Sequence, residues 1–372
     1  MSSPSRSVMV AMDATPLLGV RTGVGQSVAG FMSAVATDPD LDVIGYGLSA
    51  TAGRFLPERL PTSARAGRRI PIPAGALLRA WAHTDHPTVE VWTGPVDVVH
   101  GTNFVVPPSR KAARLVTVHD LTPVRFPELC SPTSLHYPGL IRRAIQAGAS
   151  IHTVSQSMAD DVMDHFHIEG SRVHVIHNGL TPLPPPRPRE ELEPPYILAI
   201  GTVEPRKGLP DLVAAFDGIA DSIPDIRLKI AGPPGWGEEA LAATVRSARH
   251  GDRIRRIGWS DDRSSLIAGA RLLAYPSLYE GFGLPPLEAM SLGVPVVATT
   301  AGAIPEVVGD AAVLVAPRDI PALAEALLVV AQDATTRERL IALGTERIRL
   351  FSWQRAGQQL ALLYRALADA RG

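Results

Sequence analysis

Residues 275–299, YPSLYEGFGLPPLEAMSLGVPVVAT, constrain the fold of this chain more than any other stretch. The apolar residues 272–275, where it begins, are typical of a buried strand in a parallel sheet. A loop with two glycines follows, and the proline pair after it suits the first turn of a helix, where a missing N–H costs nothing. Residues 294–298, VPVVA, predict a second buried strand. The stretch is therefore a strand–loop–helix–strand unit of an α/β fold.

This unit carries two carboxylates eight residues apart, Glu280 on the loop and Glu288 inside the helix. The backbone N–H groups of Phe282, Gly283 and Leu284 lie at the predicted helix N-terminus, where free donors and the helix dipole favour an anion. Carboxylates accept hydrogen bonds from sugar or ribose hydroxyls. A single glutamate is more often a solvated surface residue. Glycines and prolines packed around a carboxylate between apolar strands favour a polyol-diphosphate site instead.

The Glu280-to-Glu288 spacing within EGFGLPPLEAMSLGVPVVAT resembles the signature of glycosyltransferase family 4. Members of that family are retaining enzymes with two Rossmann-like domains, the GT-B architecture. In the family, the first glutamate lies beside the donor sugar and the second binds the nucleotide ribose. The resemblance extends over nearly the whole chain. It implies a nucleotide-diphosphate sugar as donor substrate, with GDP-mannose favoured, and no separate cofactor.

Composition excludes several other classes of protein. The net charge of -1 gives no bulk electrostatic reason to bind nucleic acid or an anionic membrane. Cys130 is the only cysteine, so an intrachain disulfide is impossible and a reducing compartment is expected. The N-terminus lacks the apolar core of a signal peptide, and no apolar run reaches the ~18 residues of a membrane-spanning helix. These features predict a cytoplasmic protein.

The first glycine-rich stretch follows a predicted strand at 8–13 and precedes a predicted helix at 26–36. It is a weak dinucleotide fingerprint, because Val28 occupies the third glycine position and the loop is too long for a tight turn. Gly23 and Gly25 are interpreted as part of a flexible loop that presents amides to a phosphate or an acceptor. A plain glycine turn fits the composition equally well.

The pair His119-Asp120 directly follows a predicted strand at 114–118. Open α/β sheets place functional residues at the carboxyl ends of their strands. A lone histidine is more often a packing residue, but this position favours a functional one. The family resemblance implies that His119 faces the donor sugar, and His119, Asp120 and Glu280 are the residues predicted to act at the reacting sugar.

Two charged segments in the first half of the chain each allow both a functional and a purely structural interpretation. Residues 53–79 contain six arginines and a single acid, Glu58, and are predicted to form a mobile loop followed by a short helix. This arginine-rich segment, 54–79, is either an acceptor-side patch with weak peripheral membrane contact or a solvated loop. Asp38, Asp40 and Asp42 resemble the DxD metal motif of the other major glycosyltransferase fold. They are interpreted as solvated loop acids.

The proline-rich residues 181–195 predict a stiff hinge between two domains. A second βαβ series begins at 196, and its first loop, GTVEPRKG, contains Gly201, Arg206 and Lys207 just before a helix N-terminus. Arginine gives forked phosphate contacts and lysine a point charge, so the two cations can offset a diphosphate without metal. The loop also resembles the diphosphate-binding loop of the family. No cysteine cluster or HExxH spacing is present, so no metal site is expected.

We therefore predict an α/β protein with two doubly wound Rossmann-like domains facing each other across a cleft. Residues 1–180 form the acceptor-side domain, 196–352 the nucleotide-sugar domain, and 353–372 a helix that crosses back to the first domain. The predicted reaction is metal-independent, retaining transfer of a hexose, with mannose favoured, to a hydroxyl of a glycan, a lipid-linked molecule or a small molecule. The alternatives are a non-hydrolysing sugar-nucleotide epimerase and a catalytically silent scaffold of the same fold.

Overall fold

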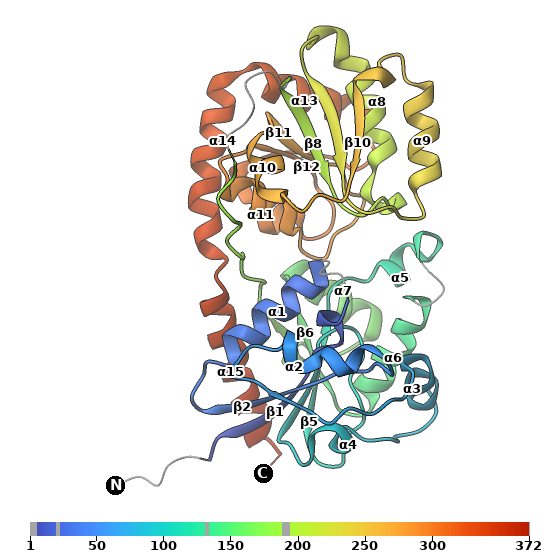
Figure 1. Cartoon of the computed structure of the whole chain (residues 1–372), viewed down its shortest axis with the longest axis vertical. Coiled ribbons are helices and arrows are strands. Elements are labelled where there is room, and N and C mark those ends of the chain that lie inside the picture. Colours follow the sequence, from blue (N-terminus) through green and yellow to red (C-terminus); the bar gives the residue numbers. More distant parts are fainter. Residues whose placement is uncertain (1–5, 20–22, 131–133, 188–193, 372) are drawn as a thin grey trace. The chain divides into compact units, whose positions relative to one another are not determined.

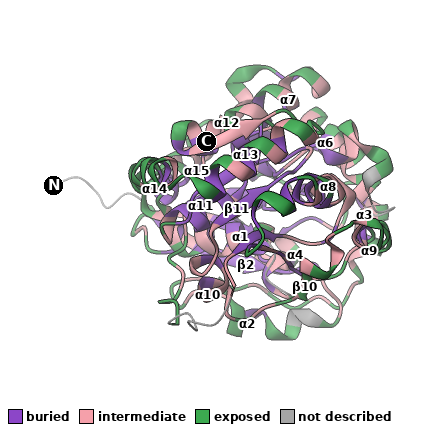
Figure 2. Cartoon of the chain, turned by 90° about the horizontal axis from the view of Figure 1, so that it is seen from above, coloured by how far each residue is buried: buried purple, intermediate pink, exposed green. Residues whose placement is uncertain are grey.

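The structure is a computed structural model that describes residues 6–19, 23–130, 134–187 and 194–371. The chain forms two compact units (Figure 1). Unit 1 comprises Met1–Thr181 and Phe351–Gly372, and unit 2 comprises Pro182–Leu350. Each unit is built on one parallel sheet. Figure 2 shows the strands β2 and β11 as buried elements of these sheets.

The sheet of unit 1 has the strand order β3-β2-β1-β4-β5-β6-β7 over the described residues. Its strands are β1 (Val8–Asp13), β2 (Leu41–Tyr46), β3 (Arg65–Ala66), β4 (Val98–Gly101), β5 (Ala113–Val118), β6 (Ser150–Thr153) and β7 (Val173–Val175). The helices described in unit 1 are α1 (Gly23–Val35), α2 (Leu56–Arg59), α3 (Ala74–Trp81), α4 (Glu90–Thr93), α5 (Thr122–Arg125), α6 (Tyr137–Gln146), α7 (Gln156–Phe166) and α15 (Trp353–Asp369).

Alternating side chains of β1 place the sheet of unit 1 between two hydrophobic cores. Val10 and Met12 pack with residues of α1 and α15, among them Phe31 and Leu360. Ala11, between them in sequence, points to the other core, which α3, α6 and α7 complete. This alternation is the expected geometry of a strand that is covered on both faces.

A buried chain of hydrogen bonds attaches α15 to this sheet. Tyr364 Oη lies 2.6 Å from His100 Nδ1, and His100 Nε2 lies 2.7 Å from Thr117 Oγ1. Thr117 Oγ1 is 2.9 Å from His152 Nδ1, and His152 Nε2 is 3.0 Å from the carbonyl oxygen of Ile176.

The direction of every hydrogen bond in this chain follows from its last member. A carbonyl oxygen only accepts, so His152 donates through Nε2 and accepts at Nδ1 from the Thr117 hydroxyl. Thr117 therefore accepts from His100 Nε2, and Tyr364 donates to His100 Nδ1. Both imidazoles are neutral, in agreement with burial, which lowers the pKa of His100 well below 6.5 and that of His152 to about 3.

The sheet of unit 2 has the order β10-β9-β8-β11-β12-β13 in the described part of the chain. Its strands are β8 (Tyr196–Ile200), β9 (Arg227–Ala231), β10 (Ile254–Gly258), β11 (Leu272–Tyr275), β12 (Val296–Thr299) and β13 (Ala312–Val315). The helices described in unit 2 are α8 (Leu209–Ile219), α9 (Glu238–Ser247), α10 (Arg263–Ala268), α11 (Leu284–Ser291), α12 (Ile304–Val308), α13 (Ile320–Gln332) and α14 (Ala334–Arg347).

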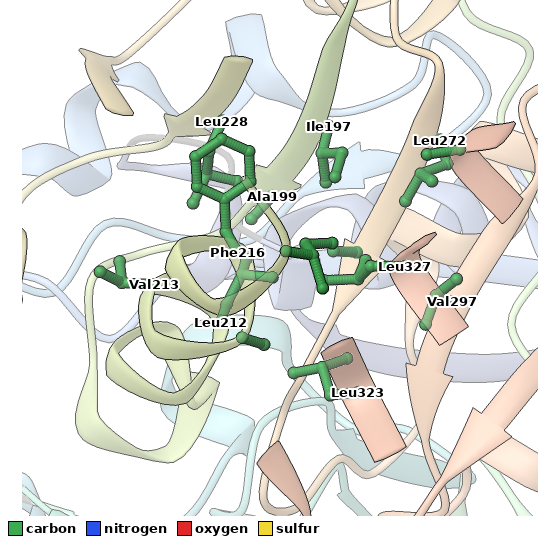
Figure 3. Packing of buried hydrophobic residues seen from close by; sticks show 14 of the residues in the cluster. Ile197, Ala199, Leu212, Val213, Phe216, Leu228, Leu272, Val297, Leu323 and Leu327 are labelled. Atoms are coloured by element: carbon green, nitrogen blue, oxygen red, sulfur yellow. The ribbon is translucent and has the colours of Figure 1, made fainter. Parts of the chain in front are cut away.

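Helices α8 and α13 supply most of the helical side of the unit 2 core (Figure 3). Phe216 of α8 and Leu327 of α13 are fully buried and belong to one cluster with Ile197, Leu272 and Val297 of the sheet. Burying a Phe or Leu side chain contributes about 1.5–3 kcal/mol each. This core fixes the strands β8 and β11, whose carboxyl ends carry the site described below.

The predicted α/β architecture is confirmed, with three local corrections. Gly23 and Gly25 do not lie in a flexible loop, because α1 already begins at Gly23. The arginine-rich segment 54–79 is not a loop followed by one short helix: it contains α2, β3 and most of α3, and β3 pairs with β2. The helix α14 was not predicted from the sequence. Along the described residues, none of the helices combines the length and the apolar character needed to cross a bilayer.

Candidate functional site

Two loops at the carboxyl edge of the unit 2 sheet bring the predicted phosphate-binding residues together with Glu280. Strands β8 and β11 are neighbours, with Ile197 paired to Leu272, so the loops that follow them meet. After β8 the chain makes a short 3-10 turn, Pro205–Lys207, and the backbone N–H of Leu278 donates to the carbonyl of Arg206 at 2.7 Å.

Four charged side chains meet where these loops join. Lys207 Nζ donates to Glu280 Oε1 at 2.5 Å, and Arg206 Nη1 lies 3.1 Å from the same oxygen. The Nε atom of Arg206 donates to Glu204 Oε2 at 3.1 Å. All four side chains are at most 19% exposed. The two cations are therefore balanced by two carboxylates, of which the sequence analysis had considered only Glu280.

Burial and charge together set the protonation of this cluster. Burial alone would raise the pKa of Glu280, but the charges of Lys207 and Arg206 outweigh it and lower the pKa to about 2. Burial and the neighbouring Arg206 lower the pKa of Lys207, against the opposing effect of Glu280. The Tyr275 hydroxyl lies 3.3 Å from Lys207 Nζ, and burial raises the pKa of Tyr275 well above 10. Glu280 is consequently a carboxylate at any physiological pH.

Two glycines allow the backbone to close tightly around the cluster. A Cβ atom on Gly302, whose φ is +55°, would lie 2.2 Å from the carbonyl oxygen of Glu280. A Cβ atom on Gly208, with φ of +62°, would lie 2.1 Å from the carbonyl oxygen of Pro276. Only glycine fits such positions without moving the neighbouring backbone. Gly201, also a predicted site residue, directly follows β8 and lies beside the Lys207 side chain.

The second predicted carboxylate, Glu288, lies in α11 and is paired with an arginine that the sequence analysis missed. Arg263 Nε donates to Glu288 Oε2 at 2.9 Å, and a second N–H of the guanidinium donates to the same oxygen. The Glu288 side chain is only 4% exposed. At the start of the same helix, Leu284 is the first residue and Gly283 the N-cap.

In unit 1, His119 follows β5 at the carboxyl edge of the sheet. Its Nε2 lies 2.8 Å from the carbonyl oxygen of Thr102, so Nε2 carries the proton and Nδ1 is an acceptor. Burial lowers the pKa of His119, which keeps the ring neutral. The Thr102 hydroxyl in turn donates to the carbonyl of Asp13 at 2.7 Å. Asp120 accepts from the backbone N–H of Thr122 at 3.0 Å, as in an Asx turn.

Asp13 is a further buried carboxylate at this edge of unit 1. It ends β1, and its Oδ1 accepts from the backbone and the side chain of Thr15. Burial raises the pKa of Asp13 to about 6 despite these hydrogen bonds. Its place at the end of the first strand was visible in the sequence, but no motif marked it. Gly23 and Gly25 lie in the first turn of α1, and Gly25 is buried there.

The aspartates of the DxD-like sequence are engaged by arginines. Arg365 of α15 lies 3.2 Å from Asp38 and 3.7 Å from Asp40. Arg65 of β3 pairs with Asp42, which lies in β2 and not in a loop. The description as solvated loop acids is therefore incomplete. Among the residues that the structure describes, no group of three or more His, Cys, Asp or Glu side chains is arranged to hold a metal ion.

Comparison with known proteins places this geometry in a family. Residues 23–182 match the family model described as Glycosyltransferase Family 4, and residues 194–333 match the one described as Glycosyl transferases group 1. The chain is 31% identical to O-antigen chain mannosyltransferase B of Escherichia coli, over 78% of this chain and 77% of that protein. The chain belongs to glycosyltransferase family 4.

Solved structures agree with this assignment at the level of the fold. Sucrose-phosphate synthase from Thermosynechococcus elongatus superposes on this glycosyltransferase with a TM-score of 0.75 and 21% identity, covering 98% of this chain and 100% of that one. The Anabaena protein HepE in complex with UDP and glucose gives a TM-score of 0.69 at 18% identity, covering 96% and 100%. The predictions of a GT-B fold and of a family 4 hexosyltransferase are thus confirmed.

The structure of the glycosyltransferase joins some predicted site residues and leaves others apart. Arg206, Lys207 and Glu280 form one contiguous cluster, whereas Glu288 pairs with Arg263. The remaining predicted residues of unit 2 are Gly201, Phe282, Gly283 and Leu284. Those of unit 1 are His119, Asp120, Gly23 and Gly25. The two residues that complete the charge pairs, Glu204 and Arg263, were not predicted. Glu204 lies in the loop GTVEPRKG, whereas Arg263 carried no signal beyond its charge.

Proposed function

We propose that this protein transfers mannose from GDP-mannose to an acceptor hydroxyl, with retention of configuration at the anomeric carbon and without a metal ion. The observation that carries the proposal is the buried cluster of Arg206, Lys207 and Glu280 at the carboxyl ends of β8 and β11. Open α/β sheets bind ligands at this edge. A buried pair of cations next to a carboxylate suits a diphosphate joined to a polyol.

The cations of the cluster receive the leaving diphosphate. Arg206 contacts Glu204 and Glu280 and also donates to the Tyr279 carbonyl at 3.2 Å. An incoming diphosphate competes with both carboxylates for its N–H groups. Lys207 has little exposure, and among the described residues its side chain bonds to Glu280 and Tyr275. In a site with little water, such fixed charges stabilise the negative charge that develops on the diphosphate as the sugar leaves.

The two glutamates have different tasks in this proposal. Glu280, with the amides of Phe282, Gly283 and Leu284, positions the sugar, and Glu288 accepts hydrogen bonds from the ribose. Both are carboxylates with small exposure, and hydrogen bonds to buried charged groups contribute about 1.5–3 kcal/mol each. The leaving phosphate takes the proton of the acceptor hydroxyl, which attacks on the face from which the diphosphate departs.

Unit 1 supplies groups for the sugar and the acceptor. The tautomer of His119 leaves Nδ1 as an acceptor, which suits a sugar hydroxyl as the donor. Asp120 helps to orient the incoming hydroxyl, and the start of α1 at Gly23 and Gly25 faces an anionic or polyol group. In the arginine-rich segment 54–79, Arg69 and Arg79 donate to backbone carbonyls of their own unit, so only weak contact with an anionic acceptor or bilayer is proposed.

The choice of mannose rests on the E. coli relative, whose name specifies mannosyl transfer. The choice of GDP over UDP rests on the family resemblance alone. The Anabaena structure, in contrast, contains UDP. We propose that the donor binds the domain of residues 196–352 and the acceptor that of residues 1–180. The hinge stays a prediction for residues 181–195, of which 188–193 lie outside the described residues. The single cysteine is typical of proteins from a reducing compartment, and we place the reaction in the cytoplasm.

The proposal is tested by donor turnover. Release of GDP from GDP-mannose is measured with and without an acceptor mixture of mannose-terminated glycans, and UDP-glucose serves as the alternative donor. The expected result is acceptor-dependent release of GDP and a product with the α-linkage of the donor. Interconversion of the donor sugar without acceptor would identify an epimerase. Absence of both reactions together with absence of nucleotide binding would identify a silent scaffold.

A further inference from the structure

The pair of Arg263 and Glu288 has a geometry that bears on nucleotide recognition. Arg263 is the first residue of α10, and Glu288 lies within α11. Two N–H groups of the guanidinium donate to the same carboxylate oxygen, Oε2. The start of α10 is itself fixed, because the Asp262 side chain accepts from the backbone N–H of Ser265 at 3.1 Å. The arginine is thus held by its helix as well as by its partner.

The other carboxylate oxygen of Glu288, Oε1, differs from Oε2 in its hydrogen bonding. Within the described residues, no protein group donates to Oε1, and this oxygen is not among the buried polar atoms that lack a partner. It therefore retains contact with solvent, although Glu288 as a whole is 3% exposed. The carboxylate has one oxygen occupied by Arg263 and one oxygen accessible to a ligand.

A ribose presents two adjacent hydroxyls. A free carboxylate can accept one hydroxyl on each of its oxygens. In this protein Oε2 already accepts two N–H groups of Arg263, whereas Oε1 accepts none from the described residues. We propose that Arg263 is a positioning residue that restricts Glu288 to a single ribose hydroxyl, accepted at Oε1. The inference rests on the proposed function, which places the nucleotide ribose at Glu288.

The test is calorimetric binding of GDP, 2′-deoxy-GDP and 3′-deoxy-GDP to the full-length protein, with the uridine series in parallel. In the wild type, one deoxy analogue should bind about 10-fold or more weakly than GDP, because it lacks the hydroxyl bonded to a buried carboxylate. The other analogue should bind within about twofold of GDP. Arg263→Met frees Oε2, so in this variant both deoxy analogues should bind more weakly than GDP.

Arg256→Met is the matched control. Arg256 also pairs with a glutamate, Glu238, and its side chain is 27% exposed against 30% for Arg263, but it does not contact Glu288. This control should keep the wild-type pattern of analogue binding. The wild-type measurement remains decisive if the Arg263 variant does not fold.

The results distinguish a failure of the role proposed for Arg263 from a failure of the ribose site proposed at Glu288. Equal weakening of both analogues in the wild type, or an unchanged pattern in Arg263→Met, would overturn the role of Arg263 while leaving the proposed function intact. If neither analogue is weakened and Glu288→Gln binds GDP normally, the ribose does not lie at Glu288, and that part of the proposed function fails as well.

Discussion

Lys207 Nζ donates a 2.5 Å hydrogen bond to Glu280 Oε1, joining the loop after β8 to the loop after β11. The group proposed to bind the diphosphate is thus held by the group proposed to position the sugar. The shared oxygen also lies 3.1 Å from Arg206. A substitution at any one of these residues alters the electrostatic potential at the other two. The effects of the three substitutions on binding and turnover are therefore not expected to be additive.

Glu280→Gln should separate nucleotide binding from turnover. The substitution removes a negative charge that competes with the diphosphate for Lys207 and Arg206, so affinity for GDP should stay the same or increase. Turnover should fall on the order of 10²-fold, because the sugar is no longer held in position. Calorimetry and initial rates measure the two effects. In the control Glu204→Gln, the Lys207–Glu280 pair is intact, and turnover should change much less. Weaker GDP binding by Glu280→Gln would contradict this division of roles.

Gly302→Ala should damage the site by displacing the Glu280 loop. The new Cβ atom would collide with the Glu280 carbonyl, and φ at this position is +55°, so unfolding free energy should fall by more than about 1 kcal/mol. Turnover should fall with it. Gly218→Ala is the matched control: Gly218 lies inside α8 with open space around its Cβ position, and alanine there should stabilise by about 0.5–1 kcal/mol. Urea unfolding compares the two, and equal stability of both variants would refute the predicted collision.

The buried histidines should make the protein less stable in mild acid. An unfolded histidine has a pKa near 6.5, whereas that of His152 is about 3 in the folded protein. The unfolded state therefore takes up a proton first, and stability is lost as the pH falls from about 6.5 toward 3. The slope approaches about 1.4 kcal/mol per pH unit for each such histidine, and His100 acts in the same direction. Asp13, with its pKa raised to about 6, opposes part of this loss between about pH 6 and 4.

Urea unfolding between pH 7.5 and 5 measures that slope. His152→Gln should be less stable than the wild type at pH 7.5 but should show a shallower loss in acid. The exposed His83 provides the control, since His83→Gln should keep the wild-type slope. An identical slope in wild type and His152→Gln would mean that His152 does not resist protonation in the folded state.

Activity should survive removal of divalent cations. The DxD-like aspartates are paired with arginines, Asp38 and Asp40 with Arg365, and Asp42 with Arg65. Their replacement by asparagine should alter stability by the roughly 0–1 kcal/mol typical of exposed ion pairs, and leave turnover near wild type. Initial rates with excess EDTA, then with added manganese, test whether turnover needs a divalent cation. Loss of turnover in EDTA and its recovery with manganese would show that a metal takes part.

Much of the fold was predictable because its signals are local. The strands β1 and β11 were predicted at 8–13 and 272–275, the bounds that the structure shows, because apolar runs mark them in the sequence. The helix α14 was missed. Its apolar face is weakly developed, and it buries only Leu340 and Gly344, so its periodicity in the sequence is faint.

The site was predictable only where a motif marked it. Glu280 and Glu288 stand in a fixed spacing, and Arg206 and Lys207 stand in a loop with a recognisable sequence. Arg263 pairs with Glu288 from another helix, a tertiary contact that no local pattern encodes. Glu204 pairs with Arg206 two positions away in the same loop, but no motif assigned it that partner. The sequence motif alone therefore predicts a positively charged site, whereas in the folded cluster two carboxylates balance the two cations.

The central claim is that the cluster of unit 2 binds the diphosphate of a nucleotide sugar. It is tested most directly by calorimetric binding of GDP and GMP to the wild type and to Arg206→Met, with Arg246→Met on α9 as control. GDP should bind the wild type and the control at least about 10-fold more tightly than GMP, because only GDP spans both cations. In Arg206→Met this preference should shrink toward equality. An undiminished preference for GDP in Arg206→Met would contradict the claim.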